Sequence, residues 1–271
     1  MRKSGLTICL AVLCFGQIAW GAGKDNANRL TATRECEECD LKGADLHQLN
    51  LERVQMEKAD LQKANLESAN LKFSNLQSCS AEGASFKGAD LTKAEMDYAD
   101  LKNTNFENAV LTGAHMDEVD LSYANFKNAD LSEAYIHHSE IESASFEGAR
   151  LNGSNLNKGD LRRSNFSKAD LGKARLNLTR LNDANLSNAN LESAELFMAN
   201  LSGANLENAN FKKAGLRDVI FHNTRLKGAD FRGADLLQSI TQPGTYVPEG
   251  IRCASITEEG GLIDGTTKCV K

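Results

Sequence analysis

The sequence predicts an all-β solenoid of about ten coils, in which the chain winds around four sides and short caps close the two ends. Three observations predict this fold. Every fifth residue from Leu41 to Leu236 is apolar, over 40 consecutive positions without an insertion. Phenylalanine recurs every 20 residues from Phe86 to Phe166, and the side chains beside these phenylalanines alternate in charge at the same spacing.

The five-residue period is incompatible with a helix or a flat strand. On an α-helix, each step of five residues rotates the side chain by about 140°, which spreads the apolar residues over all sides. On a flat strand, an odd step places successive apolar residues on opposite faces. A continuous row of inward apolar residues therefore requires the backbone to turn every five residues.

The 20-residue spacing sets the number of sides. In stacked coils, phenylalanine lies on phenylalanine and each charge meets its opposite one layer up. Twenty residues then make four sides of five, and ten coils at a strand spacing of about 4.8 Å predict a rod roughly 48 Å long. The alternating charges are Glu67, Lys87, Glu107, Lys127 and Glu147.

Residues 1–21 have the pattern of an export signal. Lys3 belongs to a basic start that precedes an apolar run from Leu6 to Trp20, and the small residues that follow predict cleavage after Gly21. The run is shorter than a membrane span of about 20 residues, so we expect no stable membrane insertion after cleavage. An uncleaved membrane anchor is the alternative.

The overall charge argues against a general nucleic-acid binder. The chain has 31 basic and 37 acidic residues, a formal charge of −6. Cleavage of the signal would leave 29 basic and 37 acidic residues, or −8. Neutralising a phosphate backbone requires an excess of positive charge, so we expect no direct contact with nucleic acid.

Residues 39–239 repeat a five-residue unit. We number its positions so that the apolar residue is third and the last two positions point outward. Alanine takes the first position in 26 of 40 units, and Asp or Asn takes the second in 24 of 40. Alanine is small enough to let the corner close, while Asp and Asn side chains form hydrogen bonds with the neighbouring backbone and stabilise the turns.

The unit resembles that of the pentapeptide repeat family, which reads A(D/N)LXX, over about residues 39–239. The resemblance implies a right-handed quadrilateral β-helix in which the first and third positions point inward. Each coil offers hydrogen-bonding edges to the next, so only the two ends of the rod need covers.

Two terminal caps are expected. Residues 22–38 form the N-terminal cap, in which residues 25–35 suit a short helix lying across the first coil. Residues 240–271 break the repeat with proline, glycine and two cysteines and form the C-terminal cap. The cysteine pairs at the two ends resemble the ends of exported family members.

Five cysteines remain after cleavage. Cys79 occupies a first position, which predicts an inert core thiol. The other four would form two local disulfides that pin the caps, Cys36–Cys39 and Cys253–Cys269, in keeping with an oxidising compartment. A redox-active Cys-x-x-Cys motif and a zinc site made of all four cysteines are the alternatives.

One side of the rod departs from the repeat. Its third positions recur every 20 residues from Met56 to Leu236, and we call the outward positions of this side the candidate face. Over three stacked coils the candidate face carries a polar grid: Glu95, His115 and Tyr135; Asp97, Asp117 and His137; Tyr98, Glu118 and His138. Further along, apolar side chains are predicted to point outward: Leu178, Phe197, Met198 and Leu237.

Two interpretations of the grid are open. A divalent metal could be held by His115, His137 or His138 together with Asp117 or Glu118. A solvated polar face whose histidines are compensated by nearby acids is favoured, so we predict no metal and no cofactor. Exposed apolar side chains in a row can mark a partner surface, which predicts that the candidate face binds an unknown protein. A homodimer through a rod end is a further possibility.

Nothing in the sequence indicates an enzyme. It contains no nucleophile elbow, P-loop, Rossmann fingerprint or HExxH motif. A convex rod also lacks the pocket that most catalysis needs. We therefore expect an exported interaction scaffold in the periplasm, outside the cell, or in the thylakoid lumen of a photosynthetic organism.

Two other functions are the alternatives. The family resemblance implies a DNA mimic that protects a type II topoisomerase, since the family includes such inhibitors of bacterial gyrase. The negative charge fits this function, but the export signal and the mixed-sign ladder conflict with it. The third candidate is a metal-binding or redox periplasmic factor.

Overall fold

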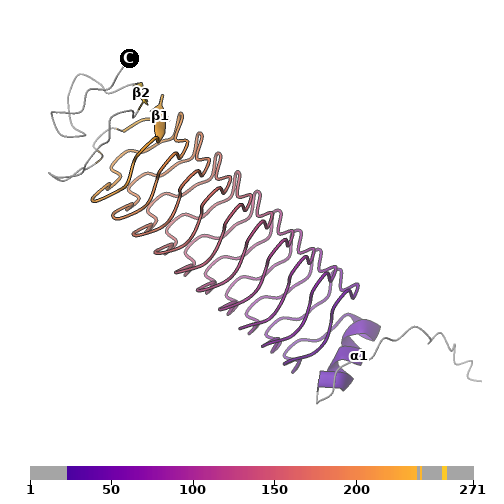
Figure 1. The fold of residues 1–271 in the computed structure, drawn as a ribbon. Helices are drawn as coiled ribbons and strands as arrows, with labels where there is room; N and C mark the ends of the chain where they lie inside the picture. The colour runs from indigo at the N-terminus through magenta and orange to yellow at the C-terminus, as the bar shows by residue number, and fades with distance from the viewer. Residues whose placement is uncertain (1–22, 237–238, 240–251, 255–271) are drawn as a thin grey trace, which may run out of the picture.

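The computed structural model describes residues 23–236, 239 and 252–254, and its coils stack into an elongated rod (Figure 1). The named elements are α1 (Gly23–Thr33), β1 (Asp230–Arg232) and β2 (Arg252–Ala254). The expected export signal at residues 1–21, Leu237, Cys269 and most of the expected C-terminal cap lie outside the described residues. In the described part of the chain, no helix has the length and apolar character needed to cross a membrane.

The rod is built from parallel bridges between residues 20 apart. They begin with Glu35 and Gln55 and recur at every second position of the unit up to Gly215 and Asp235, so four bridges define each coil. β1 continues the stack by pairing in parallel with β2, with Asp230 opposite Arg252. The predicted 20-residue coil is confirmed.

The backbone hydrogen bonds explain why the coils stack in register. The third-position N–H of Leu41 donates to the oxygen of Asp60 in the next coil at 2.7 Å, and Asp60 N–H donates back to Cys39 at 2.8 Å. Within one coil, Ala44 N–H donates to the Leu41 oxygen at 2.9 Å and closes the turn. The backbone N–H and C=O groups at the edge of each coil therefore find their hydrogen-bond partners in the next coil.

The turn places the fifth position in the left-handed backbone region. Gly203 has a φ of 72°, but Lys63 at 58° and Tyr123 at 62° adopt the same conformation. A residue other than glycine, asparagine or aspartate costs about 1–3 kcal/mol in this region. The inter-coil bonds compensate this cost, as when the Lys63 N–H donates to the Glu82 oxygen at 3.0 Å.

The core is a stack of layers, one for each coil, with the same backbone arrangement and different apolar side chains. The third-position side chains from Leu41 to Phe231 are buried, and the phenylalanine rings stack in parallel, with the Phe126 centroid 4.7 Å from those of both Phe106 and Phe146. Cys79 is buried among them, and desolvation raises the pKa of its thiol to about 12. Leu49, at a first position, is only partly buried against the core.

Asp and Asn at the second position stabilise the turns as expected. Asp60 Oδ1 accepts the Gln62 N–H at 3.0 Å, two residues further along the same coil. The same side chains also form ladders between coils, because Asn185 Nδ2 donates to Asn165 Oδ1 at 3.1 Å. Each such residue supports both its own turn and the neighbouring layer.

Two pairs of neighbouring charges in the predicted ladder form ion pairs between adjacent coils. Lys87 Nζ lies 3.3 Å from a carboxylate oxygen of Glu107, and Lys127 Nζ lies 3.6 Å from Glu147. Both pairs are exposed to solvent, so each contributes at most about 1 kcal/mol. Their main effect is that this side of the rod carries charges of both signs.

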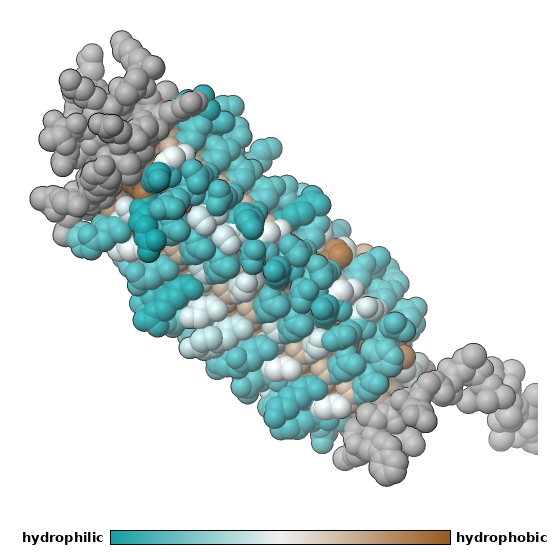
Figure 2. All heavy atoms as spheres, in the orientation of Figure 1, coloured by the Kyte–Doolittle hydropathy of each residue, from teal (hydrophilic) through white to brown (hydrophobic). Residues whose placement is uncertain are grey.

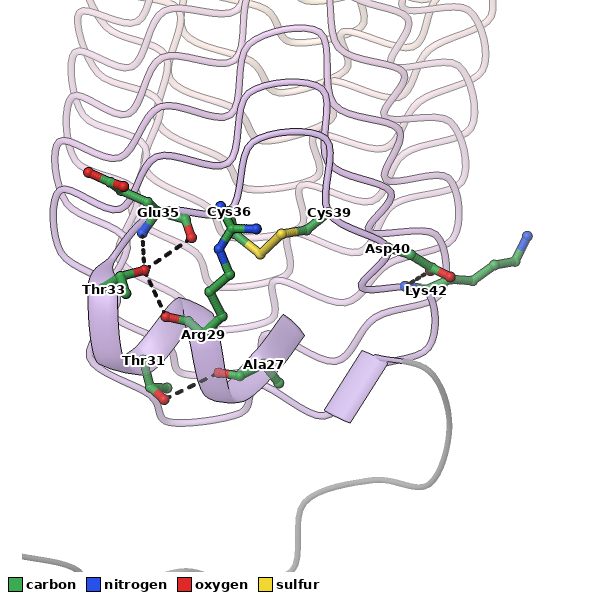
Figure 3. Close-up of a disulfide and its surroundings, with 9 residues drawn as sticks. All are labelled: Ala27, Arg29, Thr31, Thr33, Glu35, Cys36, Cys39, Asp40 and Lys42. Carbon is green, nitrogen blue, oxygen red and sulfur yellow. Dashed lines mark hydrogen bonds between the residues drawn. A yellow bond between two sulfur atoms is a disulfide. The ribbon is translucent and has the colours of Figure 1, made fainter. Parts of the chain in front are cut away.

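α1 covers the first coil (Figures 1 and 3). It spans Gly23–Thr33, two residues earlier than the predicted 25–35, and buries Ala27 and Leu30 against the core. The next residue, Arg34, adopts a φ of 60° and ends the helix. The buried Cys36 and Cys39 are joined by a disulfide where the chain enters the repeat.

Candidate interaction face

The exposed apolar side chains gather on one of the four sides. Most of the rod surface visible in Figure 2 is hydrophilic, with isolated apolar patches. The described residues include eight exposed large hydrophobic side chains, and the candidate face holds five of them: Tyr98, Tyr135, Leu178, Phe197 and Met198. The remaining three are divided among other sides: Phe73, Val110 and Tyr123.

The candidate face stabilises its turns differently from the rest of the rod. Its second positions include Glu95, His115 and Tyr135, none of which has the short side chain needed to cap its own turn. The preceding coil supplies the acceptor instead. Asp97 Oδ1 accepts the Asp117 N–H at 2.8 Å, and Asp117 Oδ1 accepts the N–H of the residue above it at 3.0 Å.

The same arrangement returns two coils later with asparagine. Asn157 Oδ1 accepts the Asn177 N–H at 2.8 Å, and Asn177 Oδ1 accepts the Phe197 N–H at 2.8 Å. The fourth-position Asp and Asn side chains are thus positioned by the backbone of the next coil. Sequence reasoning missed this role, although the loss of Asp or Asn from the second position coincides with their appearance at the fourth.

The aromatic and imidazole rings of the grid contact one another. The rings of His115 and Tyr135 stack at 4.6 Å with an interplanar angle of 12°. His137 Nδ1 lies 2.5 Å from Asp117 Oδ1, at an angle that makes no hydrogen bond, and its ring meets that of His138 edge-on at 5.1 Å.

Only part of the predicted metal-ligand set comes together. In the part of the chain that the structure describes, one group of three side chains can offer ligand atoms that all lie within 4.8 Å of one another: Asp97, His115 and Asp117. Asp97 was not expected among the ligands. Glu118, His137 and His138, which the metal interpretation also named, do not belong to this group.

The carboxylates of this group differ electrostatically from those on neighbouring sides. At Asp120, burial favours a higher pKa, but hydrogen bonds from Lys102 and Ser122 together hold the pKa below its usual value. Within the described residues, by contrast, no lysine or arginine forms an ion pair with Asp97 or Asp117. The candidate face therefore presents stacked carboxylates that no lysine or arginine neutralises within the described residues, although the His137 ring lies beside Asp117.

Two family models match the chain. The model of the pentapeptide repeat region matches residues 34–106 and 99–176, and the model of pentapeptide repeats in eight copies matches residues 199–236. The chain belongs to the pentapeptide repeat family. Neither matching model is that of an enzyme.

Several solved structures are similar to this chain. HetL, a protein involved in heterocyst differentiation regulation from Nostoc sp. strain PCC 7120, is 26% identical over 82% of this chain and 93% of its own, with a TM-score of 0.38. The fluoroquinolone resistance protein QnrB1 is 21% identical over 77% and 93%, with a TM-score of 0.47. A protein of the Arabidopsis thaliana thylakoid lumen is 28% identical over 44% and 69%, with a TM-score of 0.18. No curated protein matches the chain.

Proposed function

We propose that this chain is a non-enzymatic, exported rod that binds a protein partner through the candidate face. The observation that supports this function is the distribution of exposed large hydrophobic side chains: of the eight among the described residues, five lie on one of the four sides. Exposed apolar area that is gathered on one surface favours association, because a partner removes it from water.

The apolar end of the candidate face, formed by Leu178, Phe197 and Met198, has a better-defined geometry for docking than the polar grid. Leu178 and Met198 occupy the same position in successive coils, and the Leu178 N–H donates to the Phe197 oxygen at 2.8 Å. The three side chains are therefore neighbours on a backbone that is hydrogen-bonded on both edges. A partner would meet a preorganised surface and lose little binding energy to ordering it.

Capture of the partner tests the proposal. The Phe197→Ser/Met198→Ser double variant should lose a protein that the wild-type rod retains from an extract of the exported compartment. The matched control is Phe73→Ser/Tyr123→Ser, which removes two exposed aromatic side chains from other sides. Equal capture by both variants would contradict the assignment of the face, whereas loss in the first alone supports it.

Export is a separate part of the proposal with its own test. The Lys3–Gly21 pattern and the Cys36–Cys39 disulfide support an oxidising compartment. N-terminal sequencing of the protein from fractionated cells should give a chain that starts at Ala22. A chain that retains its first residues in the cytoplasm would contradict export and favour the topoisomerase-protecting alternative.

The DNA-mimic alternative is supported by the net charge of −6. It is opposed by the ion pairs Lys87–Glu107 and Lys127–Glu147, which interrupt the acidic rows that imitate a phosphate backbone. A supercoiling assay with purified gyrase separates the two functions. A DNA mimic inhibits the reaction or protects it from a quinolone, and the proposed scaffold does neither.

A further inference from the structure

We propose that Asp97, His115 and Asp117 form a binding site for one divalent transition-metal ion of the Zn²⁺ class. This inference goes beyond the proposed function, because the site lies within one chain and needs no protein partner. It also differs from the sequence-based expectation, which favoured a solvated polar face.

The distances suit a metal after small side-chain rotations. The three ligand atoms lie within 4.8 Å of one another. Zinc binds nitrogen and oxygen at about 2.0–2.2 Å, so tetrahedral ligands lie about 3.4 Å apart. All three side chains are exposed or half-buried, so an ion can reach their ligand atoms from solvent.

The donor set selects the class of ion. One imidazole nitrogen and two carboxylate oxygens suit Zn²⁺, since imidazole is a good ligand for zinc and carboxylate oxygens are common zinc ligands. Calcium takes six to eight oxygen ligands, and magnesium demands near-octahedral oxygen geometry. A group that offers one nitrogen among three ligands is a poor match for either of these ions.

The surrounding contacts hold the ligands in place. Asp97 Oδ1 is bound by the Asp117 N–H, and Asp117 Oδ1 is bound by the His137 N–H, so each carboxylate is oriented while its second oxygen stays available. The His115 ring is stacked on Tyr135. Such outer contacts orient metal ligands and are characteristic of protein metal sites.

Charge favours an ion at the same place. Asp97 and Asp117 stand directly above one another in adjacent coils, and within the described chain neither forms an ion pair with lysine or arginine. Carboxylate oxygens of these two residues lie within 4.8 Å of each other, and two like charges this close repel each other. A bound divalent cation converts that repulsion into attraction to a shared centre.

Zn²⁺ titration tests the site. Untagged, chelator-treated protein is titrated with ZnCl₂ in a calorimeter, and we expect one high-affinity ion. His115→Ala and Asp97→Asn should each weaken that binding at least tenfold. Asp97→Asn keeps the backbone hydrogen bond, since Asn157 and Asn177 make the same bond elsewhere on this side, so the variant should fold normally.

Two controls make the result specific. His47→Ala removes an exposed histidine whose Nδ1 lies 2.7 Å from Asp45 Oδ1. Among the described residues, this pair is not part of a group of three potential ligands, so the variant should leave Zn²⁺ affinity unchanged. Calcium in equal concentration should not displace Zn²⁺. The proposal would be overturned if His115→Ala bound Zn²⁺ with wild-type affinity or if calcium displaced Zn²⁺. It would also be overturned if Zn²⁺ binding were lost only when cysteines were substituted.

Discussion

Replacing Phe126 with leucine tests whether ring stacking, beyond simple burial, stabilises the rod. Phe126 is fully buried and lies between two parallel rings, with centroids 4.7 Å away on each side. Leucine is the usual residue at the third position, so the fold accommodates it. The substitution removes two ring contacts together with some buried apolar volume.

The control is Phe166→Leu at the end of the same ladder. Phe166 is equally buried but stacks on one ring only, that of Phe146 at 4.7 Å. An aromatic pair contributes about 0.5–1.5 kcal/mol beyond its buried area. Phe126→Leu should therefore lose about 1–3 kcal/mol from stacking and Phe166→Leu about half as much, while both lose similar burial.

Equilibrium unfolding in urea measures the difference. The free energies of unfolding should differ by about 1 kcal/mol, with unchanged denaturant slopes, since a slope change in a repeat protein signals loss of two-state behaviour. Equal losses in the two variants would refute the reasoning. The phenylalanines would then act only by filling volume, and their 20-residue recurrence would need another cause.

Three further outcomes are expected. The Cys79 thiol is buried with its pKa raised to about 12, so iodoacetamide at pH 8 should label its peptide only after unfolding, as read by mass spectrometry. Hydrogen bonds from Arg232, opposed by desolvation, hold the pKa of Asp230 below its usual value. The contribution of the ionised Asp230 to the free energy of unfolding is therefore present at neutral pH and is lost below about pH 4. Asp230→Asn should flatten the fall in unfolding free energy between about pH 5 and pH 3. Asn177→Ala should cost about 1 kcal/mol in the same urea assay by removing the Phe197 cap, whereas Asn182→Ala, at an equivalent position, should cost less than about 0.5 kcal/mol.

The 20-residue coil could be predicted from the sequence because the apolar pattern is strictly periodic. A register error of one residue would place every leucine from Leu41 onward in solvent, so the five-residue period has one consistent solution. The recurrence from Phe86 to Phe166 then determines the coil length, and the rings do stack at that spacing. The expected helix at 25–35 was right in kind and two residues late, since no strong capping residue marks its start.

The turn conformation was not predictable from local sequence. The left-handed fifth position holds glycine at some corners but Phe73, Tyr123 and Leu178 at others, residues that disfavour this conformation in isolation. Their backbone is held by bonds to the next coil, as when the Phe73 N–H donates to the Thr92 oxygen. A contact between residues about 20 apart leaves no signal within a five-residue window.

The candidate face shows how the rod can change its surface without losing its turns. From Asp117 to Phe197, every fourth-position N–H on this side has an Asp or Asn acceptor: the coil below supplies it four times, and Asn155 supplies it within the coil once, at 3.2 Å. Asn155 appears in the coil directly after His137, whose side chain replaces the Asp or Asn of the earlier coils. Since the capping requirement is met from either position, the other position is free to carry histidine, tyrosine or an apolar side chain. The polar grid and the apolar end of the face both arise where the turn is capped by an alternative residue, which is why a surface with distinct chemistry lies on an otherwise uniform rod.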